Sequence, residues 1–98
     1  MPEPPSTKAV ATVLIDNERV RVTEWRFTTG ANTGHHRHEY PYVVVPMTTG
    51  QLTIRSAAGE STSSLVAGAP YYRDAGAEHD VINSNPGEFV FVEVELKR

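Results

Sequence analysis

The chain has no cysteine, and this absence excludes several kinds of site. Disulfides, zinc–thiolate centres and cysteine nucleophiles all need a thiol, which none of the 98 residues supplies. No apolar stretch approaches the roughly 20 residues that a membrane-spanning helix needs. Residues 1–6 have neither a basic start nor an apolar stretch, so we expect no secretion signal. The sequence therefore predicts a cytoplasmic protein.

The chain also lacks any run of Lys and Arg. Nine basic and twelve acidic residues give a formal net charge of −3. A small charge of this sign does not suit nucleic acid or an anionic membrane, so we expect neither as a partner. A chain of this length has room for one core. We divide it into a leader at 1–7, expected to be flexible because of its three prolines, and a single domain at 8–98.

No segment shows a helical period. Short β-rich runs are instead separated by turn residues at roughly ten-residue spacing, which is typical of a β-sandwich or small barrel. Alternation of apolar and polar residues is clearest at 51–55 and 92–97. We predict an all-β, small antiparallel barrel with eight strands, at 9–15, 19–28, 42–46, 51–56, 63–66, 71–73, 79–84 and 89–97.

Two of these strands have apolar residues on both faces. Val22 has one strand parity, whereas Trp25 and Phe27 have the other, and 89–92 is apolar throughout. Either a bulge near Thr23 resets the register, or both faces of the strands are covered. Coverage of both faces in so small a chain predicts a homodimer.

The most informative motif is the pair His36 and His38. Residues i and i+2 of a strand face the same side about 6.5–7 Å apart, so both imidazoles can reach one metal ion. The alternative is that two histidines near a turn are merely solvated. A third histidine, His79, lies in a separate β-rich run, and the sequence alone does not bring it close to the pair.

Two motifs surround these histidines. Their residues fit G-x5-H-x-H-x11-G and G-x7-G-x2-H-x3-N: Gly30, His36, His38 and Gly50, then Gly68, Gly76, His79 and Asn83. On these residues the chain resembles the cupin superfamily, whose motifs read G-x5-H-x-H-x3–4-E-x6-G and G-x5-P-x-G-x2-H-x3-N. The resemblance is greatest to small single-domain bacterial cupins of the β-alanine-degradation type, with shared features at 21–25, 42–46 and 91–96.

The resemblance implies a cupin-type β-barrel, also described as a double-stranded β-helix or jelly roll, with a divalent metal ion in its interior. Carried over residue by residue, the metal ligands are His36, His38 and His79. Imidazole ligands do not distinguish between iron, manganese, nickel, zinc and copper. Because a ligating histidine must be neutral, we expect metal affinity to fall below about pH 6.5.

The chain departs from the family pattern at the carboxylate ligand. Counting back from Gly50 puts Val43 at that position, and Val43 has no atom that can bind a metal. A loop one residue shorter would put Tyr42 there instead. Glu39 is a further candidate, but its strand parity is opposite to that of His38. We therefore predict a three-histidine site without a protein carboxylate; Asp74 likewise replaces the usual proline of the second motif.

Three neutral histidines leave the charge of a divalent ion uncompensated, so we expect a small anionic or chelating ligand as partner. Tyr42, Tyr72 and Arg73 are candidates for a substrate pocket, against the simpler interpretation that they pack or are exposed. Three functions remain open: a metal-dependent enzyme, such as the iron dioxygenases among three-histidine cupins, a binding module without turnover, and a metal-free structural barrel. We assign no catalytic residue.

Overall fold

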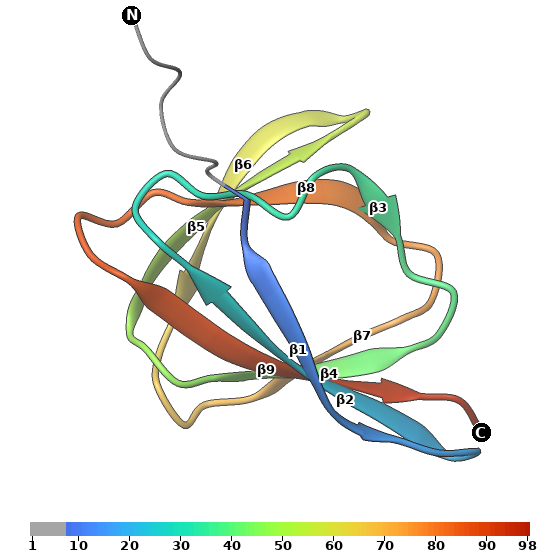
Figure 1. The fold of residues 1–98 in the computed structure, drawn as a ribbon. Coiled ribbons are helices and arrows are strands. Elements are labelled where there is room, and N and C mark those ends of the chain that lie inside the picture. The colour runs from blue at the N-terminus through green and yellow to red at the C-terminus, as the bar shows by residue number, and fades with distance from the viewer. Residues whose placement is uncertain (1–7) are drawn as a thin grey trace, which may run out of the picture.

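The computed structural model describes residues 8–98, and the leader predicted at 1–7 lies outside that range. Nine strands follow one another along the described residues (Figure 1): β1 (Val10–Asp16), β2 (Val20–Phe27), β3 (His36–Arg37), β4 (Tyr42–Pro46), β5 (Gly50–Ser56), β6 (Gly59–Leu65), β7 (Tyr71–Arg73), β8 (Glu78–Asn83) and β9 (Phe89–Leu96). All eight predicted strands are present. The additional one, β3, is only two residues long, and β6 begins four residues before its predicted start. No helix in residues 8–98 is long and apolar enough to cross a membrane.

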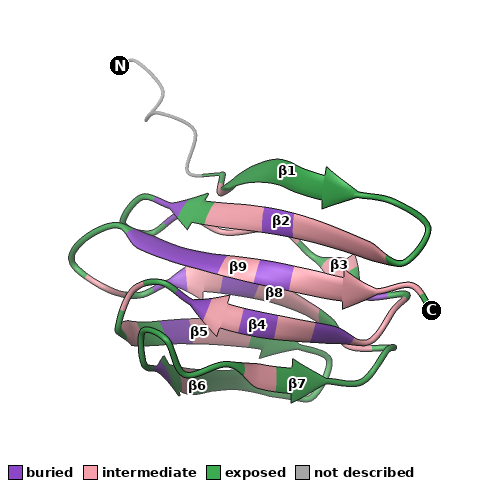
Figure 2. Ribbon diagram, turned by 90° about the horizontal axis from the view of Figure 1, so that it is seen from below, coloured by how far each residue is buried: buried purple, intermediate pink, exposed green. Residues whose placement is uncertain are grey.

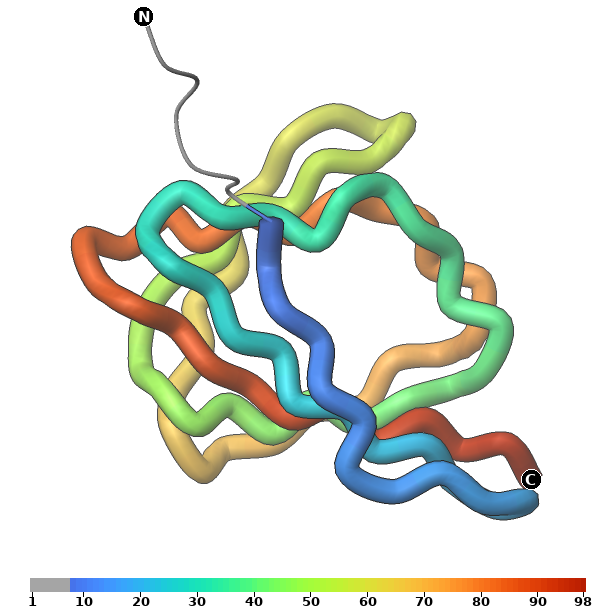
Figure 3. The backbone as a smooth tube through the Cα atoms, in the orientation of Figure 1, coloured from blue at the N-terminus to red at the C-terminus, as the bar shows by residue number. Residues whose placement is uncertain are grey.

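The strands form two antiparallel sheets that enclose a common interior (Figure 3). One sheet has the order β1-β2-β9-β4-β7 and the other β3-β8-β5-β6. The last strand, β9, lies between β2 and β4, so the end of the domain is inserted near its beginning. This jelly-roll arrangement confirms the all-β prediction. The two sheets remain separate hydrogen-bonded units and are not joined into one continuous barrel.

The core lies between the sheets and contains several aromatic side chains. Phe27 and Phe89 are fully buried, and the ring of Phe27 lies 5.5 Å from that of Phe91. Figure 2 shows the buried residues concentrated in β9, β4 and β8, whereas the edge strand β1 is exposed along its whole length. Phenylalanines of β2 and β9 therefore fill part of the space between the two sheets.

The apolar residues on both faces of β2 are explained without a break in its alternation. β2 and β9 pair in continuous register over the whole of β2. The bulge lies instead in the neighbouring β1, between Val13 and Ile15. Trp25 and Phe27 therefore face the interior, whereas Val22 lies on the outer face. The register of β2 is therefore not reset, and its apolar side chains lie on both faces; whether a partner covers the outer face stays a prediction.

Asn83 holds the end of β8 to two other segments. Its side chain is almost completely buried, and its Nδ2 donates to the carbonyl oxygens of Thr28 at 3.1 Å and Gly87 at 2.9 Å. Its Oδ1 accepts from the backbone N–H of Asn85 at 3.0 Å. These bonds join β8 to the ends of β2 and the loop before β9. They lie at the opposite end of β8 from His79, which leaves the histidine end free to form a site.

Candidate metal centre

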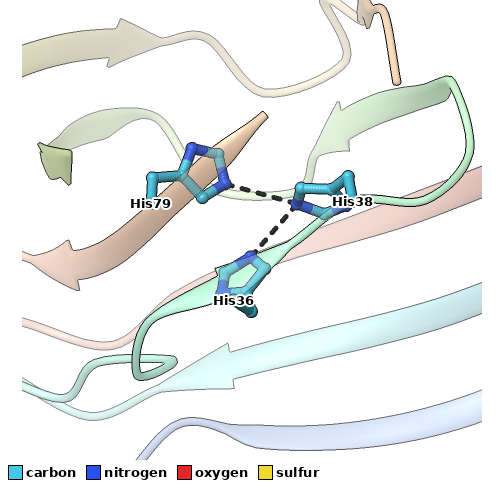
Figure 4. A group of neighbouring side chains, drawn as sticks. All are labelled: His36, His38 and His79. Carbon is cyan, nitrogen blue, oxygen red and sulfur yellow. Dashed lines mark hydrogen bonds between the residues drawn. The ribbon is translucent and has the colours of Figure 1, made fainter. Parts of the chain in front are cut away.

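Strands β3 and β8 bring the three histidines together from distant parts of the chain. His36 and His79 are direct partners in the antiparallel register between these strands. The ladder continues past β3, because the N–H of His38 donates to the carbonyl of Ala77 at 2.9 Å and the N–H of Gly76 donates to the carbonyl of His38 at 2.8 Å. Figure 4 shows the three imidazoles pointing toward one another.

The distances between the ring nitrogens suit a single ion. Nε2 of His38 lies 3.1 Å from Nε2 of His36 and 3.3 Å from Nε2 of His79. Two nitrogens bound at about 2.1 Å to one ion are about 3.0 Å apart at a right angle and about 3.4 Å apart at the tetrahedral angle. Both measured separations fall in that interval. The nitrogens that the three residues offer all lie within 4.8 Å of one another, so together they could hold a metal ion.

The surroundings of His36 set which of its nitrogens faces the cluster. Its Nδ1 lies 2.9 Å from the carbonyl oxygen of Gly34, which can only accept a hydrogen bond. Nδ1 therefore carries the proton, and Nε2 presents its lone pair to the other histidines, as metal-binding imidazoles do. Asp80 fixes this loop by accepting the N–H of Gly34 at 3.0 Å. The donor set and its orientation therefore fit a divalent cation.

His38 is the most buried of the three and is held by a tyrosine. Its side chain is 6% exposed, and its ring stacks on that of Tyr42 with centroids 3.9 Å apart and an interplanar angle of 21°. Tyr42, one of the residues considered for the position of the carboxylate ligand, therefore lies beside the histidines. The count from Gly50 favoured Val43, but Val43 follows Tyr42 in β4 and has the outward parity. The alternative with a loop one residue shorter agrees with the structure.

Burial and mutual repulsion keep two of these histidines neutral. Burial, followed by the positive charge of neighbouring histidines, lowers the pKa of His38 to about 4. Burial and His36 likewise lower the pKa of His79 to about 4. Neutral imidazole is the form that binds a metal. Proton competition at these two residues therefore begins at a lower pH than the value of about 6.5 expected from the sequence.

A buried carboxylate, Glu93 of β9, completes the surroundings of the site. Its Oε1 lies 3.7 Å from Nδ1 of His38. Burial, with a smaller contribution from Glu95, raises the pKa of Glu93 to about 8. Sequence analysis did not select this residue. Strand alternation could have identified it, because Glu93 follows Phe91 by two residues and therefore faces the same interior.

Three cavities adjoin the histidines. One, of about 270 Å³, is lined by Trp25, His36, His38 and Glu93 among others, and the ring of Trp25 stacks on that of His36 at 6.4 Å. Positive and negative side chains both reach this cavity, which suits a small polar ligand. Its walls place open space directly against two of the three imidazoles. Another, of about 350 Å³, reaches His79 and is lined mainly by residues of β5 and β6.

The smallest of the three cavities, of about 20 Å³, is lined by two of the three predicted pocket residues. Tyr42 and Arg73 line it together with His79 and Tyr71. Tyr72 does not join them, because alternation in β7 turns Tyr71 inward and leaves Tyr72 55% exposed on the outer face. The inward tyrosine of β7 is therefore the neighbour of the one predicted from the sequence.

Comparison with known proteins gives a consistent assignment, although no family model matches the chain. The chain is 54% identical over 90 residues to the β-alanine degradation protein BauB of Pseudomonas aeruginosa, covering 92% of this chain and 95% of that protein. A cupin domain from Bordetella pertussis is also 54% identical and superposes with a TM-score of 0.94, over 98% of this chain and 100% of that one. The polyketide cyclase RemF of Streptomyces resistomycificus has the same fold, with a TM-score of 0.73 at 19% identity over 100% of this chain and 71% of its own. The chain therefore belongs to the cupin superfamily, among the small single-domain cupins related to BauB.

Proposed function

We propose that this protein is a metal-dependent enzyme that transforms a small chelating molecule at a divalent ion held by His36, His38 and His79. The observation that carries the proposal is that Nε2 of His38 lies 3.1 Å from Nε2 of His36 and 3.3 Å from Nε2 of His79, separations that suit one ion, beside a cavity of about 270 Å³. Three histidines leave positions of a divalent ion open. When bound, such an ion acidifies water and polarises a coordinated oxygen.

The residues around the cavity favour a short ligand with an acidic group. The uncompensated charge of the ion attracts a carboxylate, enolate or thiolate, and Arg21 at the cavity wall adds positive charge. Glu93 on the same wall can accept a hydrogen bond from an amine or hydroxyl. The ring of Trp25 lines the same cavity and stacks on His36. The name of the relative BauB, which concerns β-alanine degradation, supports three-carbon acids as the first compounds to test.

The test is turnover by protein loaded with iron or another single divalent metal. We expect oxygen consumption or product formation with at least one member of a panel of thiols, diketones and short carboxylic acids, including β-alanine and its deaminated derivatives. Mass spectrometry of untagged protein purified without added metal should detect a bound transition metal. Metal and ligand binding without turnover would identify a binding module instead. Protein that binds no metal would leave only a structural role.

We also propose that the protein is a homodimer, supported by an apolar row on the outer face of the five-stranded sheet. The row follows the strand register across all five strands: Ile15, Val22, Val94, Val43 and Tyr72. The two end residues, Ile15 and Tyr72, are 49% and 55% exposed. A second copy presents the same row, so a two-fold contact would cover both at once. This role accounts for the outward tyrosine of β7.

Replacing Val94, at the centre of this row, with glutamate should dissociate the dimer. A buried charge at the centre of an interface costs about 2 kcal/mol or more, so the dissociation constant should rise at least about thirtyfold. Analytical ultracentrifugation at micromolar concentration should show twice the monomer mass for the wild type and the monomer mass for Val94→Glu. The control is Met47→Glu, because Met47 is 59% exposed and lies outside the row. A wild-type protein that sediments as a monomer would contradict the proposal.

A further inference from the structure

Glu93 is a carboxylate buried in the interior beside the three histidines. It pairs with Thr23 of β2 and Val44 of β4 in the strand register, and its side chain is only 8% exposed. Burying an ionisable group is costly unless a partner compensates for it. A glutamine or leucine of similar size would fill the same space without that cost. The carboxylate at this position therefore calls for a partner with which it interacts.

The nearest nitrogen of the site belongs to His38. Oε1 of Glu93 lies 3.7 Å from Nδ1 of His38, while Nε2 of the same ring faces His36 and His79. A charge-assisted hydrogen bond is about 2.8 Å long, so forming one here requires a small adjustment of the two side chains. The stacked ring of Tyr42 holds the plane of the imidazole during that adjustment. Glu93 therefore lies behind the ligand, on the side away from the ion.

The ligand set itself leaves a charge for this carboxylate to balance. His36, His38 and His79 are neutral when they bind a metal. Tyr42, which stacks on His38, offers a phenol and no carboxylate. Glu93 reaches the same histidine from a different strand. It is the buried acidic residue of the described chain that contacts a histidine of the site.

We infer that Glu93 is the positioning residue of the metal centre: when a metal is bound, its carboxylate accepts a hydrogen bond from the Nδ1–H of His38 and so aims Nε2 at the ion. The inference rests on the proposed metal site. Metal-bound histidines commonly donate their second N–H to a carboxylate, which fixes the tautomer and strengthens the ligand. Glu93 acts through His38 and does not itself bind the ion.

The test compares Glu93→Gln with Glu95→Gln. Both variants remove one carboxylate from the same face of β9, but Glu95 lies two residues farther along and pairs with Arg21 at 3.8 Å. Zinc affinity is measured by competition with a chromophoric chelator. We expect Glu93→Gln to weaken zinc binding about 10–100-fold. The Glu95→Gln control should stay within about threefold, since its charge acts from farther away. Glu93→Asp, which keeps the charge, should restore part of the loss.

A spectroscopic readout separates positioning from a merely structural effect. In the zinc-loaded wild type, ¹⁵N NMR should show His38 protonated at Nδ1, with a downfield proton that shifts on Glu93→Gln. X-ray absorption should show the same number of nitrogen and oxygen ligands in both proteins. Loss of an oxygen ligand in the variant would make Glu93 a direct ligand and overturn the inference, as would zinc affinity equal to that of Glu95→Gln. Failure of the wild type to bind zinc would instead refute the proposed function.

Discussion

Replacing His38 with alanine should release the metal and leave the two sheets folded. His38 contributes one of the three nitrogens, and its Nε2 lies 3.1 Å from Nε2 of His36 and 3.3 Å from Nε2 of His79. Loss of a residue that only supports a ligand already costs about 10–100-fold in metal affinity, so loss of the ligand itself should cost more than about a hundredfold. The ring that stacks on Tyr42 is lost as well, which should cost about 1–3 kcal/mol of unfolding free energy.

The measurement is metal content after dialysis, together with circular dichroism to verify the fold. The matched control is His35→Ala, because His35 is the neighbouring histidine, is 64% exposed and lies near Glu78 instead of the cluster. We expect a stoichiometric metal ion in the control and almost none in His38→Ala. A His38→Ala protein with its full metal content would show that the ion is held elsewhere.

The strand pattern and the histidine pair were predictable because both depend on local order. Turn residues separate β-rich runs, and those runs became eight of the nine strands. His36 and His38 share a face because of their spacing alone. The two-residue strand β3 escaped prediction because so short a segment has no alternation of its own. It exists because it pairs with β8.

The rest of the site depends on which strands become neighbours, and this depends on contacts far apart in sequence. His79 meets His36 only through the register of β3 and β8. Alternation at 92–97 marks Val94 as apolar and Glu93 as polar, which normally predicts the valine inside. Here the valine faces outward and the carboxylate inward, because Glu93 shares the face of Phe91. A strand with apolar residues on both faces removes the signal on which a sequence-based assignment relies.

The burial of Glu93, His38 and His79 predicts how the stability of the metal-free protein depends on pH. Burial lowers the pKa of His38 and His79 to about 4, so the unfolded chain binds more protons between about pH 4 and 6.5, and acidification destabilises the fold. Burial raises the pKa of Glu93 from 4.5 to about 8, so the folded chain keeps a proton that the unfolded chain loses. Stability from this residue therefore falls as the pH rises from about 4.5 to about 8.

The two contributions should give a maximum of stability near pH 6.5. Below that value the two histidines outweigh the single carboxylate. Above it the contribution of Glu93 outweighs the declining contribution of the histidines, with a slope of at most about 1.4 kcal/mol per pH unit. Urea unfolding of chelator-treated protein at intervals from pH 5 to pH 9 measures this curve. A wild-type curve that is level from pH 6.5 to pH 8 would show that Glu93 is already ionised in the folded, metal-free protein.

Glu93→Gln should remove the fall in unfolding free energy above pH 6.5, because glutamine keeps the shape of the side chain and has no proton to lose. Its advantage in unfolding free energy over the wild type should grow from pH 6.5 to about pH 8 and then stay constant. Glu95→Gln should retain the decline. With saturating zinc at pH 7.5, the wild type should instead have the higher unfolding free energy of the two. Zinc binding stabilises the folded state by an amount that depends on affinity, and Glu93→Gln binds zinc more weakly. A carboxylate that lowers stability without metal and raises it with metal is retained for binding, and an unchanged order on addition of zinc would contradict that role.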